Sequence, residues 1–380
     1  MIVLKLKLRI KNKKQKYNRV MKRSVLFLSG LLAFSVAFGQ NLAKSEANSL
    51  KNFISQTSNK GGTNGEALGF NGSNWKDIGV TVENGHVIEI KWDHKDLAGT
   101  LNLNNFPNLQ KVNVSDNKIT QLTVNATPAL TYLNASKNKI QQVDLKGAGQ
   151  LQTLYLNKNK INSITLGQIP FIQKLNLSGN NLVALDVSSA ANLTYLNVMS
   201  NDLEELTVAN CQTLKTLYAG YNDLTGIELT GLPKLENLNL QGNKIQNLYI
   251  ENLPALVSLA CNDNHMTGLA INNCKALSSV FAPYNDLTNF TVSNVPTLAF
   301  LNLEWNDLTN LTLTNQNFLQ RVDVSNNQLQ SLDLSFDPML SYLNISNNIN
   351  LTTLLVTGDS QLRQVVGEWT GLQMDEPEAF

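Results

Sequence analysis

The sequence predicts a β-rich solenoid, a superhelix of stacked coils with short parallel strands on both faces and a helical cap at its N-terminal end. Two observations predict this fold. Apolar residues recur with a fixed period of 21 residues over most of the 380-residue chain, and a period of this length is typical of repeat architectures. Within each period the apolar residues alternate as they do along one face of a strand, and no run of useful length has helical spacing.

Twelve rows of 21 residues follow one another from Leu109, with one extra residue in the last row. A degenerate row from Val87 precedes them, so we expect a solenoid of about 13 coils over residues 87–362. Counting the first residue of a row as offset 0, apolar residues fall at offsets 0, 3, 5, 10, 13 and 15, as in the row that begins at Leu151. Each coil should therefore carry two short strands that face each other across an apolar core, and one coil cannot bury that core without its neighbours.

Asparagine occupies offset 8 in eleven successive rows, and we name these residues the asparagine ladder. Its members are Asn117, Asn138, Asn159, Asn180, Asn201, Asn222, Asn243, Asn264, Asn285, Asn306 and Asn327. Offset 8 lies where the chain leaves the first strand and turns. Backbone N–H and C=O groups that face inward at a turn need partners, and an asparagine amide both donates and accepts. The ladder is therefore predicted to be structural.

The repeated pattern resembles the leucine-rich repeat signature L-x-x-L-x-L-x-x-N-x-L. Its nested form, ten residues and then eleven, is similar to the 21-residue class found in exported bacterial proteins, and it covers about residues 87–362. The resemblance implies a non-catalytic protein that binds other proteins on its strand face.

Two caps are expected to cover the ends of the solenoid. Apolar residues at helix-like spacing in residues 42–57, followed by Trp75 and Trp92, indicate an N-terminal cap over residues 40–86. This segment is similar to the N-terminal caps of plant leucine-rich repeat proteins, without their cysteine pairs, and both tryptophans are expected to pack rather than bind. Residues 363–380 form a short predicted C-terminal cap.

Residues 1–39 read as an upstream extension followed by a signal peptide, with either Met1 or Met21 as the start. Lys22 and Arg23 precede a short apolar run, and small residues end at Gly39. The run is too short to span a bilayer comfortably. We therefore expect export, with a mature chain that spans no membrane and is found outside the cell, on its surface or in the periplasm.

Net charge narrows the class of possible partners, and the number of cysteines limits disulfide pairing. Residues 1–39 contain ten Lys or Arg and no Asp or Glu, so the remaining chain has 20 basic and 29 acidic residues and a net charge of −9. Binding to a phosphate backbone depends on clustered cations, so nucleic acid is not an expected partner. The odd number of cysteines (Cys211, Cys261 and Cys274) rules out a fully paired disulfide set, and buried free thiols are expected instead.

The sequence offers little that could support catalysis. His94 lies beside Asp93 and Asp96, but three potential ligands in one short turn are weak support for a metal site, and a solvated turn of the cap explains them better. None of the motifs G-x-S-x-G, H-E-x-x-H, the P-loop or C-x-x-C occurs. We expect neither an enzyme nor a bound cofactor or metal.

The strand face offers candidate binding residues. Offsets 2, 4 and 6 should project outward, with offset 7 at the rim and asparagine the usual residue at offset 4. Departures from this pattern mark candidate partner-binding residues: Phe281, Tyr284, Phe300 and Trp305, with Tyr218 and Tyr221 as outlying contacts. Pro283 cannot donate to a ladder of strand hydrogen bonds and is expected to interrupt it. Five lysines gather at offsets 7 and 9 of early rows: Lys118, Lys137, Lys139, Lys158 and Lys160.

Three functions fit these observations. The first is an exported, monomeric binding module that presents its strand face to an extracellular or cell-surface protein. The second is carbohydrate binding, in which exposed Tyr and Trp rings would stack on sugars. The third is a structural spacer or adhesin stalk about 60 Å long, from about thirteen coils at ~4.8 Å each. The fold by itself does not establish which of these holds.

Overall fold

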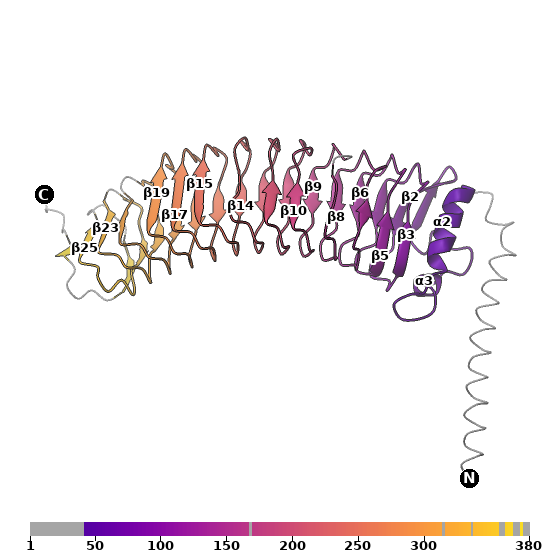
Figure 1. Cartoon of the computed structure of the whole chain (residues 1–380), viewed down its shortest axis with the longest axis horizontal. Helices are drawn as coiled ribbons and strands as arrows, with labels where there is room; N and C mark the ends of the chain where they lie inside the picture. The colour runs from indigo at the N-terminus through magenta and orange to yellow at the C-terminus, as the bar shows by residue number, and fades with distance from the viewer. Residues whose placement is uncertain are drawn as a thin grey trace, which may run out of the picture.

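The computed structural model describes residues 42–166, 169–313, 316–335, 337–356, 362–367 and 373–374. The predicted leader, its cleavage site and much of the predicted C-terminal cap lie outside these residues. Figure 1 shows an elongated, gently curved solenoid with helical structure at its N-terminal end. No helix in the described part of the chain has the length and apolar character needed to cross a membrane. The predicted domain boundaries stay predictions.

One face of the solenoid is a single 15-stranded sheet, which we name the long sheet. In spatial order it contains β1 (Val80–Glu83), β2 (His86–Lys91), β4 (Lys111–Asn113), β6 (Tyr132–Asn134), β8 (Thr153–Tyr155), β9 (Lys174–Asn176), β11 (Tyr195–Asn197), β13 (Thr216–Tyr218), β14 (Asn237–Asn239), β16 (Ser258–Ala260), β18 (Ser279–Phe281), β20 (Phe300–Asn302), β22 (Arg321–Asp323), β24 (Tyr342–Asn344) and β26 (Gln364–Val366). Apart from the antiparallel pair β1–β2 its strands are parallel, and partners such as Lys111 and Tyr132 stand one row apart. Residues at one offset therefore stack in lines across the sheet.

The opposite face carries four shorter sheets. These are β3 (Ala98–Asn102), β5 (Lys118–Thr123) and β7 (Val143–Asp144); β10 (Ala184–Asp186) and β12 (Glu205–Thr207); β15 (Asn247–Glu251), β17 (Gly268–Asn272) and β19 (Asn289–Ser293); and β21 (Asn310–Thr312), β23 (Ser331–Leu334), β25 (Thr353–Val356) and β27 (Gln373–Met374). Parallel strands on both faces are thus confirmed. The second face is broken where residues 161–166 and 224–229, both in the described part, form no strand.

The aliphatic residues fill the space between the two faces. In the coil that begins at Leu151, the side chains of Leu151, Leu154 and Ile161 are completely buried. Ile164 of the same coil is only partly buried, and it lies in a stretch where the second strand is missing. Because each coil exposes both core edges to its neighbours, this burial depends on stacking.

The asparagine ladder is structural, as predicted. Nδ2 of Asn138 donates to the carbonyl oxygen of Val114 in the preceding coil (3.0 Å) and to that of Ala135 in its own coil (3.1 Å). Its Oδ1 accepts the N–H of Ile119 (2.9 Å). Asn348, which the sequence prediction left out, continues the ladder with the same pattern of bonds. Each amide thereby joins two successive coils.

The extra residue of the last row leaves the stack without disturbing it. Asn310 pairs with Ser331 at a separation of one row, whereas Ser331 pairs with Thr353, one residue further along. Between these strands Ile349 is 92% exposed. The chain therefore extrudes the extra residue and restores the register on both sides of it.

The N-terminal cap contains two helices, α2 (Lys44–Ile54) and α3 (Asn64–Leu68). Phe53 of α2 stacks on the buried indole of Trp92, with ring centroids 5.5 Å apart. The indole N–H of Trp92 donates to the carbonyl oxygen of Ile78 (2.8 Å). Trp92 is therefore a packing residue, as expected.

Two side-chain amides of the cap cover the open edge of β3. Oε1 of Gln56 accepts the N–H of Thr100 (2.7 Å), and its Nε2 donates to the carbonyl oxygen of Thr100 (2.8 Å). Asn64 bonds both backbone groups of Ala98 in the same way. An edge strand with unpaired backbone groups invites further strand pairing, so these amides finish the sheet without another strand.

The three cysteines are buried and unpaired. Burial raises the pKa of the Cys261 thiol to about 12 and that of Cys211 to about 11. Thiols held in this state are poor nucleophiles, which fits a packing role.

Candidate functional site

The asparagines at offset 4 of the long sheet are not free surface groups. In eight coils the side-chain oxygen at offset 4 accepts the backbone N–H two residues later, as Asn239 accepts that of Gln241 (3.1 Å). The residues that do so are Asn113, Asn134, Asn176, Asn197, Asn239, Asn302, Asp323 and Asn344. This local bond explains why asparagine is the usual residue there, and the sequence prediction missed it.

The expectation that Pro283 interrupts the strand ladder is wrong. The N–H of Ala282 donates to the carbonyl oxygen of Asn302 (2.9 Å), and the N–H of Tyr284 donates to that of Glu304 (3.1 Å). The ladder therefore continues on both sides of Pro283. In other coils the residue at offset 6 donates its N–H to the side-chain oxygen at offset 4. In this coil the residue at offset 4 is Phe281, which has no acceptor, so the missing N–H of Pro283 leaves no hydrogen bond unmade.

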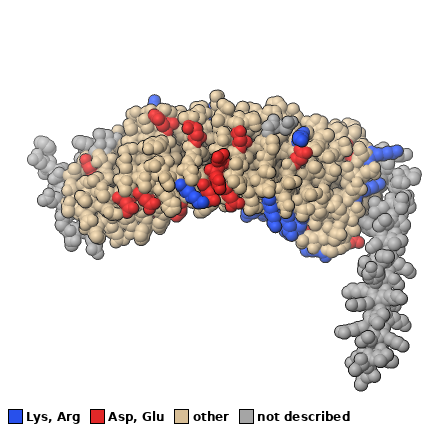
Figure 2. Space-filling view, in the orientation of Figure 1, with Lys and Arg blue, Asp and Glu red and all other residues tan. Residues whose placement is uncertain are grey.

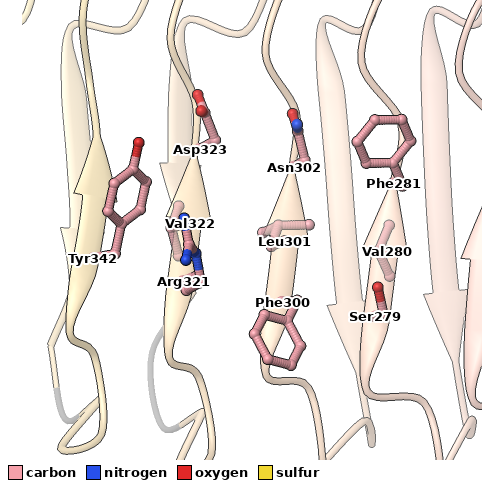
Figure 3. A pocket seen from close by; sticks show the side chains of 10 residues that line it. All are labelled: Ser279, Val280, Phe281, Phe300, Leu301, Asn302, Arg321, Val322, Asp323 and Tyr342. Atoms are coloured by element: carbon pink, nitrogen blue, oxygen red, sulfur yellow. The ribbon is translucent and has the colours of Figure 1, made fainter. Parts of the chain in front are cut away.

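Phe281 and Phe300 border a shallow hollow on β18, β20, β22 and β24. The hollow has a volume of about 180 Å³. The register places Ser279, Phe300, Arg321 and Tyr342 in one line across the four strands, with Phe281, Asn302, Asp323 and Asn344 in a parallel line. Figure 3 shows these side chains, except that of Asn344, standing on adjacent strands. The hollow is part of the open face of the long sheet.

Arg321 and Tyr342 belong to this site, although the sequence prediction did not include them. The guanidinium carbon of Arg321 lies 4.4 Å from the centroid of the Tyr342 ring, within the range of a cation–π contact. Within the described residues, the Arg321 guanidinium forms no ion pair with a carboxylate. The usable signal was the succession of large side chains at offset 2 from Phe300 onward.

Tyr284 and Trp305 form an exposed ridge beside this hollow. Their rings stack with centroids 6.0 Å apart and planes 14° apart. Tyr284 is 50% exposed and Trp305 is 52% exposed. We use the name C-terminal cluster for six residues: Phe281, Tyr284, Phe300, Trp305, Arg321 and Tyr342.

The left-handed backbone at offset 7 gives this ridge a cost in conformational free energy. Tyr284 has φ 56° and Trp305 has φ 52°, so both lie in the left-handed region. That conformation costs an ordinary side chain roughly 1–2 kcal/mol, and glycine, asparagine and aspartate tolerate it best. Six coils place such residues at this offset, namely Asp116, Gly179, Gly242, Asp263, Asn326 and Asn347, whereas Lys137, Lys158, Ser200 and Tyr221 share the left-handed backbone with Tyr284 and Trp305. Bulky aromatic residues here work against stability, and the stacking of the two rings offsets only part of that cost.

Tyr218 and Tyr221 do not join the C-terminal cluster. β13, which contains Tyr218, is separated from β18 by β14 and β16. Tyr218 packs edge-on against Tyr195, with centroids 6.0 Å apart. The Tyr221 ring covers Gly242 of the next coil, where an added Cβ would lie 2.7 Å from it. The predicted site residues therefore form two separate groups, and their role in binding stays a prediction.

Charge changes sign along the solenoid. Figure 2 shows Lys and Arg side chains gathered in the N-terminal third and Asp and Glu side chains across the middle. In the middle, Lys215 pairs with Glu236 (2.8 Å) and Lys244 pairs with Asp223 (2.9 Å). These pairs are exposed and contribute little stability.

His94 takes part in a polar cluster at the N-terminal end. Its Nδ1 lies 3.1 Å from Asp93, and its Nε2 lies 3.0 Å from Asp116 of the next coil. Among the residues that the structure describes, no group of three or more His, Cys, Asp and Glu side chains is arranged to hold a metal ion. The cluster joins two coils at the surface.

Comparisons with known proteins agree with this architecture. The family model for leucine-rich repeats in two copies matches residues 212–255. YopM from Yersinia pestis, a leucine-rich effector protein, is similar in structure with a TM-score of 0.59 at 20% identity, over 93% of each chain. The internalin InlF from Listeria monocytogenes gives a TM-score of 0.53 at 20% identity, over 88% of this chain and 97% of its own. YopM from Yersinia enterocolitica gives 0.53 at 22% identity, over 76% of this chain and 78% of its own.

No curated protein sequence matches the chain significantly. The likeness to the solved structures concerns the fold alone. Within this chain, successive strand pairs repeat at the spacing of one row. The chain has the leucine-rich repeat fold, with nested coils one row long.

Proposed function

We propose that this protein is an exported, non-catalytic and monomeric leucine-rich repeat module that binds an extracellular or cell-surface protein. The C-terminal cluster on the long sheet is the proposed contact surface. Export is supported by the leader pattern of residues 1–39, which lie outside the described structure. The proposed destination is the cell surface or the extracellular space, with the periplasm as a further compartment.

The observation that carries the proposal is the pair of exposed aromatic side chains at strained positions, Tyr284 and Trp305. Strained backbone concentrates at functional sites. Trp, Tyr and Arg are also the residues that contribute most to protein–protein binding energy. Phe281, Phe300 and Arg321 extend the surface onto the neighbouring strands, so a partner could cover a continuous patch.

Carbohydrate binding is the second candidate. A sugar stacks on the free face of an aromatic ring, but Tyr284 and Trp305 each turn one face towards the other. Their edges and the hollow beside them suit a protein surface with side chains that fill gaps. This arrangement favours a protein over a glycan, and a spacer role would leave the strained aromatics unexplained.

The test presents the purified chain from Gln40 onward to two arrays, one of extracellular and cell-surface proteins and one of glycans. We expect a protein to bind, and the Trp305→Ala and Tyr284→Ala variants to bind it at least about tenfold more weakly, equivalent to about 1.4 kcal/mol. Asn326→Ala, at the same offset one coil further on, is the matched control. Binding to glycans alone would support the carbohydrate function, and binding to neither array would support a spacer.

A further inference from the structure

A second hollow on the long sheet lies far from the C-terminal cluster. It has a volume of about 320 Å³. Its lining residues are Ser136, Tyr155, Asn157, Lys174, Asn176 and Tyr195. They come from β8, β9 and β11 and from the turns that follow β6 and β8, and the register sets Lys174 between Thr153 and Tyr195.

Two tyrosines, Tyr155 and Tyr195, line this hollow, and each packs against a further tyrosine. Tyr132 packs edge-on against Tyr155 with centroids 6.1 Å apart, and Tyr195 packs edge-on against Tyr218 with centroids 6.0 Å apart. Burial raises the pKa of Tyr155, with smaller contributions from neighbouring tyrosines. Its hydroxyl therefore keeps its proton at neutral pH and remains a hydrogen-bond donor.

One lysine, Lys174, lines the hollow, and further lysines lie close in sequence to two of its other lining residues. Lys137 directly follows Ser136, Lys158 directly follows Asn157, and both side chains are exposed. Lys139 and Lys160 lie two residues further along and are also exposed. The ion pairs found within the described residues involve other lysines, so no carboxylate in that part of the chain neutralises any of these four or Lys174. The lining thus combines one cation with tyrosine hydroxyls and contains no carboxylate side chain, and exposed lysines follow two of its residues in sequence.

We propose that this hollow, with its rim lysines, binds an acidic peptide segment of a protein partner. A carboxylate side chain enters the hollow, where the ammonium group of Lys174 and the hydroxyl of Tyr155 donate to its oxygens. Further carboxylates of the segment pair with Lys137 and Lys158. The inference rests on the proposed function in that the long sheet is the binding face, but it concerns different residues.

The distribution of charge favours a short acidic peptide over a nucleic acid. Together with Lys118 and Lys174, the lysines of this region occupy four successive coils, a distance of about 14 Å along the axis. Further along, Asp202 and Asp223 take the place of the lysines at offset 9. A phosphate backbone needs a longer line of cations and would meet these carboxylates. A peptide with a few acidic residues fits the length of the basic region.

The experiment measures fluorescence anisotropy of a short labelled peptide that alternates Glu and Ser, with the purified chain from Gln40 onward. A matched peptide with Gln in place of Glu and a short oligothymidylate are the comparison probes. We expect the Glu peptide to bind, and the Gln peptide and the oligothymidylate to bind at least tenfold more weakly. Added salt should weaken the binding of the Glu peptide. Tighter binding of the oligothymidylate, or no binding of the Glu peptide, would overturn the proposal.

Single-residue variants test whether the peptide binds at this hollow. Lys174→Met should weaken binding of the Glu peptide at least tenfold. Tyr155→Phe keeps the ring packing and should weaken that binding severalfold. Lys244→Ala, an exposed lysine of a later coil, is the matched control and should bind normally, and unchanged thermal unfolding verifies that each variant folds. An unaffected Lys174→Met variant contradicts the proposal.

Trp305→Ala separates this inference from the proposed function. Normal binding of the Glu peptide by this variant is the expected result. If Trp305→Ala abolishes that binding, the acidic peptide occupies the C-terminal cluster, and the present inference fails while the proposed function stands. If the arrays yield no partner for the C-terminal cluster but the Glu peptide still binds through Lys174, the proposed contact surface fails and this inference stands.

Discussion

Single residues at the rim of the long sheet combine a conformational cost with an exposed position. The fold imposes a left-handed backbone at offset 7, where glycine and asparagine would be the least strained choices. Tyr221, Tyr284 and Trp305 instead occupy that position with half of their surface exposed. A stability–function trade-off of this kind predicts that some replacements lose binding without losing stability.

Trp305→Asn tests that trade-off. The change relieves roughly 1–2 kcal/mol of backbone strain and loses about 0.5–1.5 kcal/mol of stacking on Tyr284. The urea midpoint should therefore stay the same or rise, while partner binding weakens at least about tenfold. Asn326→Ala at the next coil should leave binding unchanged. A midpoint that falls by as much as for a core substitution would show that the indole is structural.

Asn222→Ala tests the asparagine ladder. Asn222 donates to the carbonyl oxygens of Val198 (3.0 Å) and Ala219 (3.0 Å) and accepts the N–H of Leu203 (3.1 Å). Each buried group left without a partner costs about 1–3 kcal/mol. Asn239→Ala removes one bond at the half-buried strand face and should cost clearly less. Equal urea midpoints for the two variants would mean that offset 8 is solvated.

Asp337 predicts a pH effect on stability. Burial raises the pKa of this carboxyl to about 7, and Asp333 adds to the rise, whereas the N–H of Gln316 opposes it. Between pH of about 4 and about 7 the folded chain holds a proton that the unfolded chain has released, so the free energy of unfolding falls as pH rises. Asp337→Asn should therefore gain stability over the wild type as pH rises from 4 to 8. Parallel pH curves for Asp337→Asn and wild type would refute the assignment.

Among the strands, β3 has an open edge whose backbone groups are bonded by side-chain amides rather than by another strand. Asn64→Leu removes the amide that bonds both backbone groups of Ala98. We expect the N-terminal end to open locally, at about 1–3 kcal/mol for each buried group exposed. Hydrogen exchange of residues 98–102 should accelerate, while exchange in central strands such as β14 stays the same. Asn52→Ala, at an exposed position of α2, is the control, and slow exchange of β3 in Asn64→Leu would show that the cap amides are dispensable.

The whole molecule is a stack in which each coil touches only its neighbours. Stability in such a chain is a sum over coils and their interfaces. Deleting one complete row, residues 235–255, brings equivalent offsets of the flanking coils into register because strand partners stand one row apart. The shortened chain should fold and unfold cooperatively with a moderately lower midpoint. Deleting one residue fewer should be far more damaging, since it moves the following strand side chains to the wrong face. Equal stability of the two deletions would contradict the register.

The sequence by itself determined the period, the number of coils, the inward faces and the asparagine ladder, because these features repeat within every row and depend on local spacing. The tertiary structure decided what depends on neighbours a full row apart. Only stacking shows that one face is a continuous sheet while the other is broken, and that Arg321 and Tyr342 stand in line with Phe300. The left-handed backbone at offset 7 and the ladder that continues past Pro283 are likewise consequences of how each coil turns against the next. Side chains at the same offset of successive rows become neighbours only when the coils pack, so the candidate sites exist only in the assembled stack.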